Sequence, residues 1–119
     1  MKALLCRAYG PIENLRVEDV PSPEPGPRQV LVDVKAASIN FPDALIVQGM
    51  YQVKPPVPFS PGAEFTGVVK AVGAEVKGFK PGDRVIAFGG HGGFAEECAV
   101  DVERLSPLPA GMDFEIGAA

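Results

Sequence analysis

Two stretches decide the fold of this chain: Ala37-Ser38-Ile39-Asn40-Phe41-Pro42-Asp43 and Pro61-Gly62-Ala63-Glu64-Phe65-Thr66-Gly67-Val68-Val69. The first closes a run of alternating side chains from Gln29 to Ala37, the pattern of a half-buried strand. It then opens the one convincing helix, over about 42–48, because proline suits a first helical turn and Ser38 or Asn40 suits a cap. The second stretch opens a β-branched strand over 64–72. The sequence therefore predicts a short helix between two long strands.

Working outward, the rest of the chain is also rich in strands and turns. Alternating or β-tolerant runs predict further strands over 1–9, 15–20, 84–88 and 94–102, and a helix is expected to start at Asp113. Thirteen prolines and fourteen glycines are spread along the chain, as turn residues are. Lys80-Pro81-Gly82-Asp83 suits a type II turn. Six short strands separated by about 8–12 residues predict an antiparallel or mixed β barrel or sandwich.

Composition narrows the class of protein. The length of 119 residues suits one domain. A net charge of −4 and eleven scattered basic residues argue against a nucleic-acid or anionic-membrane surface, which needs clustered Lys and Arg. Neither a signal peptide nor an apolar run of about 18–20 residues is evident, so a soluble cytoplasmic protein is expected. Cys6 and Cys98 form no recognisable framework and are expected to be reduced thiols, with a disulfide as the alternative.

A glycine-rich motif over 90–95 imitates a nucleotide-binding fingerprint. Gly90-His91-Gly92-Gly93-Phe94-Ala95 matches G-x-G-x-x-A, but that fingerprint must open a helix. The residues that follow alternate like a strand, so a turn is predicted instead. His91 is the only histidine, and no cysteine or carboxylate lies near it at metal spacing. It is expected to be exposed or to bond within the turn, and no metal site is predicted.

Four segments, in this order and spacing, resemble the N-terminal GroES-like domain of medium-chain dehydrogenases/reductases. They are 29–40, 61–69, 72–73 and 80–85. The resemblance covers nearly the whole chain and implies a mainly β, partly open GroES-like barrel with one or two short helices. It implies that 1–112 is the catalytic, substrate-side domain. Residues 113–119 would start a helix that leads to a Rossmann domain absent from this chain.

The resemblance also points to one branch of the family. In zinc-dependent alcohol dehydrogenases the position of Asn40 is a catalytic cysteine and that of Ala63 is a ligating histidine. A four-cysteine zinc lobe is also missing here, because Gly89 to Gly93 runs straight into Phe94. This combination looks like the quinone oxidoreductase (zeta-crystallin-like) branch, which uses NADPH without zinc. The implied function is hydride transfer to quinones or activated enones by a longer protein, expected to be a homodimer, and the chain alone is expected to be inactive.

The resemblance nominates five site residues, each with a simpler alternative. The Asn40 amide and the Tyr51 hydroxyl would donate hydrogen bonds to a substrate carbonyl oxygen and also contact the nicotinamide side of NADPH. Phe41, Asp43 and Glu64 would line the substrate cleft. Alternatively, Asn40 is only a helix cap and Tyr51 a loop aromatic. Asp43 would then serve the helix dipole, Glu64 would be a structural acceptor, and Phe41 would face the core.

Two other functions stay open. One is an enoyl-thioester reductase of the same superfamily. The other is a non-catalytic GroES-like module that oligomerises or binds a partner. Catalysis predicts that the side chains of Asn40 and Tyr51 point into one open cleft beside Phe41. A structural module predicts that both donors are bonded internally and that no cleft exists.

Overall fold

The fold is a computed structural model that describes residues 1–52 and 54–118. Within these ranges it holds seven strands and two short α-helices. The strands are β1 (Lys2–Leu5), β2 (Arg16–Asp19), β3 (Gln29–Ala37), β4 (Glu64–Val72), β5 (Arg84–Phe88), β6 (Glu97–Asp101) and β7 (Leu105–Pro107). The helices are α1 (Phe41–Val47) and α2 (Phe114–Ala118), with single 3-10 turns η1 (Ile12–Asn14) and η2 (Val102–Arg104).

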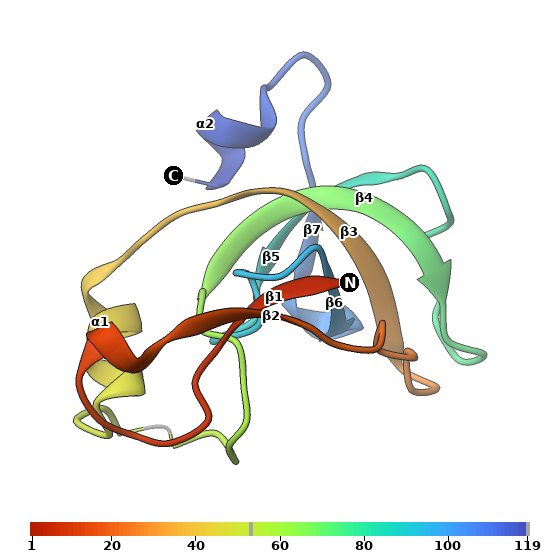
Figure 1. The fold of residues 1–119 in the computed structure, drawn as a ribbon. Coiled ribbons are helices and arrows are strands. Elements are labelled where there is room, and N and C mark those ends of the chain that lie inside the picture. Colours follow the sequence, from red (N-terminus) through yellow and green to blue (C-terminus); the bar gives the residue numbers. More distant parts are fainter. Residues whose placement is uncertain (53, 119) are drawn as a thin grey trace.

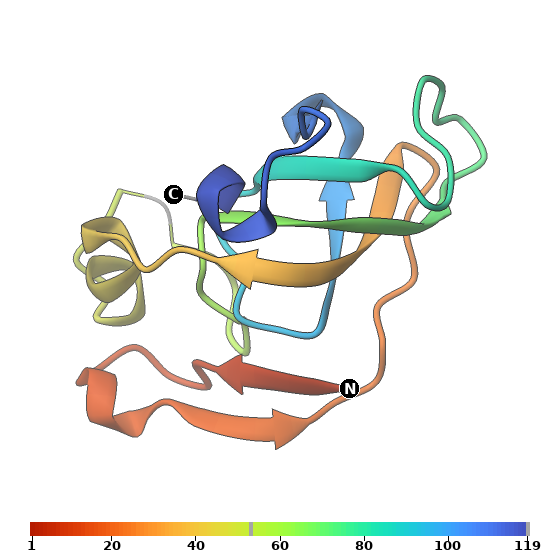
Figure 2. The same ribbon diagram turned by 90° about the horizontal axis from the view of Figure 1, so that it is seen from above.

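The strands form two antiparallel sheets. β1 pairs with β2, and the five-stranded sheet has the order β6-β3-β4-β5-β7. β3 and β4 arch over the molecule in Figure 1, and the β1–β2 pair forms a separate layer in Figure 2. Neither sheet closes on itself. The predicted mainly β, partly open GroES-like fold is therefore confirmed.

The long strands match their sequence patterns, whereas the ends of the chain differ. β3, β4 and β5 have the predicted bounds. The predicted strand over 1–9 stops at Leu5, because the backbone of Cys6 turns to pair with Phe59 instead of β2. The residues before β6 likewise join β1, with the Leu4 N–H donating to the Phe94 carbonyl at 2.8 Å. β7 was not predicted, since three residues carry no readable period.

Two apolar clusters hold the layers together. The larger lies against the five-stranded sheet and contains Val30, Val32, Phe65, Val69, Val85, Ala87, Val100 and Leu105. The smaller contains Cys6, Ile46, Val47 and Phe59 and seats α1. Burying each large apolar side chain contributes about 1.5–3 kcal/mol relative to exposure. The smaller cluster therefore anchors α1 through its last turn, and the first turn meets the start of β4.

Two local predictions from the sequence are confirmed at the turn and at α2. The Asp83 N–H donates to the Lys80 carbonyl at 3.1 Å, and Gly82 has the positive φ of 94° that a type II turn requires. α2 begins one residue after Asp113 and is tied to β4 by the Thr66 hydroxyl, which donates to the Phe114 carbonyl at 2.8 Å. That α2 leads to a further domain stays a prediction.

Candidate active site

The end of β3 and the start of β4 bring three predicted or neighbouring polar residues together. The Asn40 side-chain nitrogen donates to Ser38 Oγ at 3.1 Å and to Glu64 Oε2 at 3.3 Å. Ser38 Oγ lies 3.4 Å from the same Glu64 oxygen. The cause is the antiparallel pairing of the two strands, continued by the Ser38 N–H, which donates to the Glu64 carbonyl at 3.1 Å. A closed triangle of hydrogen bonds results.

Asp43 ties this triangle to α1. Its Oδ2 accepts the Asn40 N–H at 2.8 Å, and its Oδ1 accepts the Ala63 N–H at 3.0 Å. The carboxylate sits at the third position of α1, where a capping residue reaches back to the residue before the helix. Only 4% of Asp43 is exposed. One buried carboxylate therefore joins the first turn of α1 to the segment that enters β4.

These hydrogen bonds limit how the Asn40 side chain can donate to a substrate. Its side-chain nitrogen has two hydrogens, and Ser38 and Glu64 supply acceptors for both. The Asn40 amide can therefore donate to a substrate only after releasing one of these internal partners. The geometry suits Glu64 as a structural acceptor and Asp43 as a positioning residue, while their predicted place in a substrate cleft stays a prediction.

Tyr51 and Phe41 lie more openly than Asn40. Tyr51 follows the far end of α1, is 36% exposed and makes no hydrogen bond to any described residue. Phe41 is 77% exposed, so the alternative that it faces the core is wrong. Ile39 is 85% exposed, and Phe88, the register partner of Glu64, is also exposed. Exposed large apolar side chains therefore neighbour Asn40 in the sequence and Glu64 in the strand register.

The residues available for metal ligation do not converge. Within residues 1–52 and 54–118, no three His, Cys, Asp or Glu side chains come together as a metal site would require. Cys6 and Cys98 are both free thiols. Cys6 belongs to the cluster that seats α1, and burial raises the pKa of Cys98 to about 11. At position 63 only an alanine methyl group is present.

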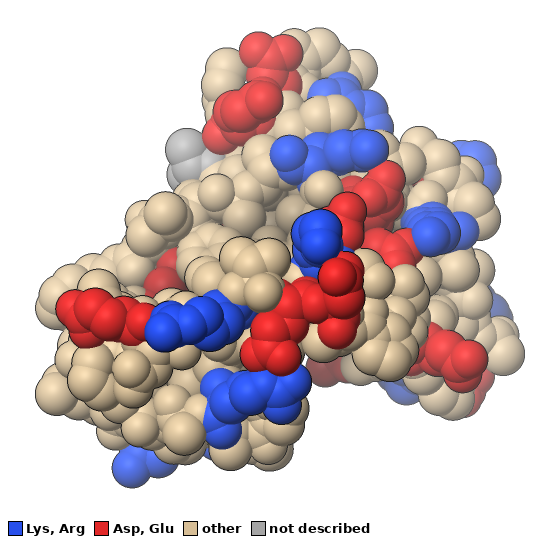
Figure 3. All heavy atoms as spheres, viewed as in Figure 1, with Lys and Arg blue, Asp and Glu red and all other residues tan. Residues whose placement is uncertain are grey.

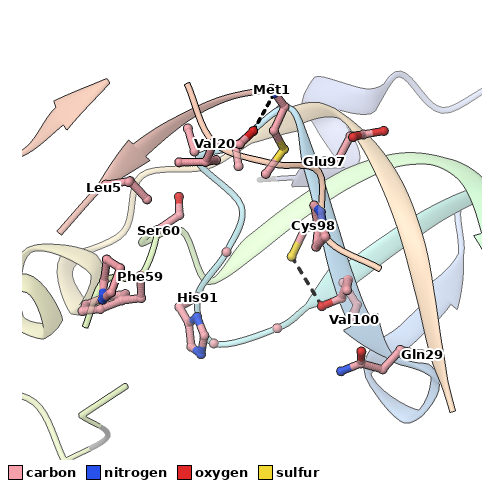
Figure 4. Close-up of a pocket in the computed structure, with 18 of the residues that line it drawn as sticks. Met1, Leu5, Val20, Gln29, Phe59, Ser60, His91, Glu97, Cys98 and Val100 are labelled. Atoms are coloured by element: carbon pink, nitrogen blue, oxygen red, sulfur yellow. Dashed lines mark hydrogen bonds between the residues drawn. The ribbon is translucent and has the colours of Figure 1, made fainter. Parts of the chain in front are cut away.

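His91 lines a separate hollow (Figure 4), and Asn40 is not among the residues that line it. The expectation that it is exposed or bonded within its turn is wrong. The imidazole is half-buried and meets the Phe59 ring edge-on, with the ring centres 5.8 Å apart. The cause is the fold-back of the glycine loop, in which the Gly92 N–H donates to the Ser60 carbonyl at 2.7 Å. Burial and the nearby Arg104 cation lower the pKa of His91.

Comparison with known proteins shows which family this chain belongs to. Residues 26–110 match the alcohol dehydrogenase GroES-like domain. The chain belongs to this family. It is similar to rat "Quinone oxidoreductase-like protein 2", with 43% identity over 107 residues, 89% of this chain and 30% of that protein. Its relatives indicate the N-terminal domain of a medium-chain dehydrogenase/reductase in the quinone oxidoreductase branch.

Solved structures extend the likeness to the fold. The human synaptic vesicle membrane protein VAT-1 homolog-like protein superposes with a TM-score of 0.93 and 36% identity, over 100% of this chain and 38% of that one. The Escherichia coli quinone oxidoreductase complexed with NADPH also has a TM-score of 0.93, at 31% identity, over 100% of this chain and 36% of that one. The chain therefore spans about a third of the length of the proteins it matches.

Two surface observations complete the description. Across the described ranges, none of the helices is long and apolar enough to span a bilayer. On the face shown in Figure 3, the Lys and Arg side chains are separated by acidic or uncharged surface.

Proposed function

We propose that this chain is the substrate-side domain of a zinc-independent, NADPH-dependent oxidoreductase that reduces quinones or activated enones. The observation that carries the proposal is the Asn40–Ser38–Glu64 triangle, with an alanine at position 63 directly before Glu64. By the resemblance, metal relatives place a thiolate and an imidazole at positions 40 and 63. Here hydrogen bonds organise the same place. The likeness to quinone oxidoreductases, one of them complexed with NADPH, supports the substrate class and the cofactor.

In this proposal NADPH, when bound, supplies the hydride, and this chain supplies donors and an apolar surround. Addition of hydride to a quinone or enone leaves negative charge on the carbonyl oxygen. The Tyr51 hydroxyl, which no described residue engages, is the donor free to stabilise that charge. Asn40 would donate on the nicotinamide side once its side-chain nitrogen releases Ser38 or Glu64. Exposed Ile39 and Phe41 flank Asn40 and would exclude water from a flat ring.

The proposal extends to the whole protein as a cytoplasmic homodimer whose partner is a small quinone or enone.

A second candidate, a non-catalytic binding module, is favoured by one observation. The Asn40 amide is internally bonded, as such a module predicts. The two candidates differ in whether the Tyr51 hydroxyl is needed for turnover.

Tyr51→Phe is expected to lower kcat/KM for quinone reduction roughly tenfold, since one lost oxyanion donor costs at least that much in other enzymes. The assay follows NADPH absorbance with 1,2-naphthoquinone, using the whole protein that contains this chain. Tyr9→Phe is the matched control, because Tyr9 is the only other tyrosine and its hydroxyl bonds to the Pro55 carbonyl.

The outcomes separate the candidates. Absence of NADPH oxidation by the whole protein would favour the binding module. Normal turnover by Tyr51→Phe would remove Tyr51 from the mechanism while leaving the reductase proposal standing. The 119-residue chain alone is expected to leave NADPH fluorescence unchanged, and micromolar binding to it would contradict the expectation that the cofactor is held mainly elsewhere.

A further inference from the structure

The hollow in Figure 4 lies between the β1–β2 layer, β6 and the glycine loop. Its volume is about 550 Å³, within the range of small-molecule sites. None of the five predicted site residues lines it. Its walls are largely apolar and include Ala3, Leu5, Val20, Phe59, Cys98 and Val100.

The charged groups around the hollow differ in how they are paired. Glu97 forms an ion pair with Lys70, whereas Asp101 keeps its charge and accepts the neutral Gln29 side-chain N–H at 3.1 Å. Arg104 differs, since it donates only to the Phe88 carbonyl at 3.3 Å and has no carboxylate partner among the described residues. Arg104 is therefore a cation at this hollow that no described carboxylate pairs with.

His91 adds a second group that can meet an anion. Its ring makes no side-chain hydrogen bond to a described residue, and it meets the Phe59 ring in a T-shaped contact. Arg104 lines the same hollow, and its cation lowers the pKa of His91. An imidazole, a guanidinium and an aromatic wall thus share one apolar hollow.

We propose that this hollow binds a small aromatic carboxylate. The aromatic body packs against Phe59 and Leu5, and the carboxylate meets Arg104 and His91. Charge complementarity selects the anion, because the unpaired guanidinium would stay unmatched beside a neutral ligand. The site is independent of the reductase proposal, since it shares no residue with the Asn40 triangle.

Binding of this ligand is coupled to a proton. In the free chain, burial and the Arg104 cation disfavour the charged form of His91, which lowers its pKa. A bound carboxylate favours that form and raises the pKa, so the complex holds more protons than the free chain. Of the other titratable groups that line this hollow, Cys98 stays a neutral thiol and Glu97 is paired with Lys70. The Met1 amino group donates to the Val20 carbonyl at 2.7 Å, and Asp101 accepts the Gln29 side-chain N–H. Affinity is therefore expected to rise as pH falls from about 7.5 to about 5.5, where the ligand remains ionised.

The test uses naphthalene-2-carboxylate, with naphthalene-2-carboxamide as its neutral match. Both are titrated into the 119-residue chain and followed by NMR. His91 is the only histidine, so its Cε1–H resonance reports its pKa without assignment ambiguity. We expect the carboxylate to bind about fivefold more tightly than the amide, the scale of one exposed ion pair. The His91 pKa should rise on saturation, and the Leu5 and Val100 amides should shift.

Two variants complete the design. Arg104→Gln should weaken the preference for the carboxylate over the amide, because it removes the guanidinium that meets the carboxylate. Arg104 is exposed, so its loss should leave the core intact. Lys77→Gln removes the same charge from the turn between β4 and β5, which does not line the hollow, and should keep the preference. Equal affinity for the two ligands, or an unchanged preference in Arg104→Gln, would overturn the proposal. A downward shift of the His91 pKa on binding would do so too.

Discussion

Replacing Asp43 with alanine is expected to lower the free energy of unfolding by roughly 3 kcal/mol or more. The Asp43 carboxylate is 4% exposed and accepts both the Asn40 and the Ala63 N–H. Its removal leaves two backbone N–H groups without an acceptor, and each buried unsatisfied donor costs about 1–3 kcal/mol. Small domains have only about 5–15 kcal/mol of stability, so this is a large share. Urea denaturation followed by circular dichroism measures the change.

Asp43→Asn refines the test, because it keeps the size of the side chain. Its oxygen can accept one N–H, but its NH₂ group then faces the other donor, so we expect a loss of about 2 kcal/mol. Asp113→Asn is the matched control, since Asp113 is exposed just before α2, and it should change stability by less than about 0.5 kcal/mol. A loss below about 1 kcal/mol for Asp43→Ala would show that water replaces the carboxylate at both N–H groups.

Amide hydrogen exchange gives a local readout of the same contact. Faster exchange at Ala63 and Asn40 in Asp43→Asn, with protection in β5 retained, would place the effect at this junction. The consequence for function follows from the geometry. Asp43 sets where Asn40 stands relative to the start of β4, and Asn40 in turn bonds to Glu64 at that start. A substitution at Asp43 should therefore disturb the position of Asn40 in the candidate site.

The sequence was informative where one strand or turn carries its own pattern. The alternation over 29–37 and the β-branched run over 64–72 predicted β3 and β4 with their observed bounds. A strand's burial pattern is local, because successive side chains point to opposite faces. β7 could not be predicted in this way, because three residues define no period and its position depends on pairing with β5.

The candidate site was less predictable, because its contacts depend on which strands pair. Asn40 and Glu64 are 24 residues apart, and no local pattern announces that their side chains meet. The sequence suggests Ser38 only as a helix cap. In an extended chain, however, the side chains of residues 38 and 40 point to the same face. That spacing was the available signal for its role. The burial of His91 against Phe59 likewise depends on a contact between distant loops.

Gly67→Ala is also expected to lower the free energy of unfolding strongly, by roughly 3–4 kcal/mol. Gly67 is buried in β4, in the middle of the second deciding stretch, and pairs with Val34 on one side and Val85 on the other. A Cβ here would collide with the Asp33 backbone carbonyl and lie 2.7 Å from the Val32 side chain. Real Cβ atoms do not approach backbone so closely, and a carbonyl inside a sheet cannot turn away as a flexible side chain can.

The reason for this close approach is the curvature of the sheet. The β3–β4 register shifts between Leu31 and Val32 and again between Val34 and Ala36, and the two strands arch together in Figure 1. Such irregularities bend strands and increase their twist. Gly67 lies beside the second shift, so its missing side chain lets β3 and β4 stay paired through the bend.

Gly78→Ala is the matched control for Gly67→Ala. Gly78 has a φ of 89° but nothing within 4 Å of its would-be Cβ, so only backbone strain of about 1–2 kcal/mol is expected. Thermal and urea unfolding of both variants measure the difference.

If Gly67→Ala costs no more than Gly78→Ala, the sheet can open by several tenths of an ångström at little cost. The position of Asn40 would then not depend on the close approach at Gly67, and the Gly67→Ala and Asp43→Ala substitutions should combine additively. If Gly67→Ala is severe, curvature and site geometry are coupled, because the same pair of strands that Gly67 holds close also carries Ser38 and Glu64 at its end.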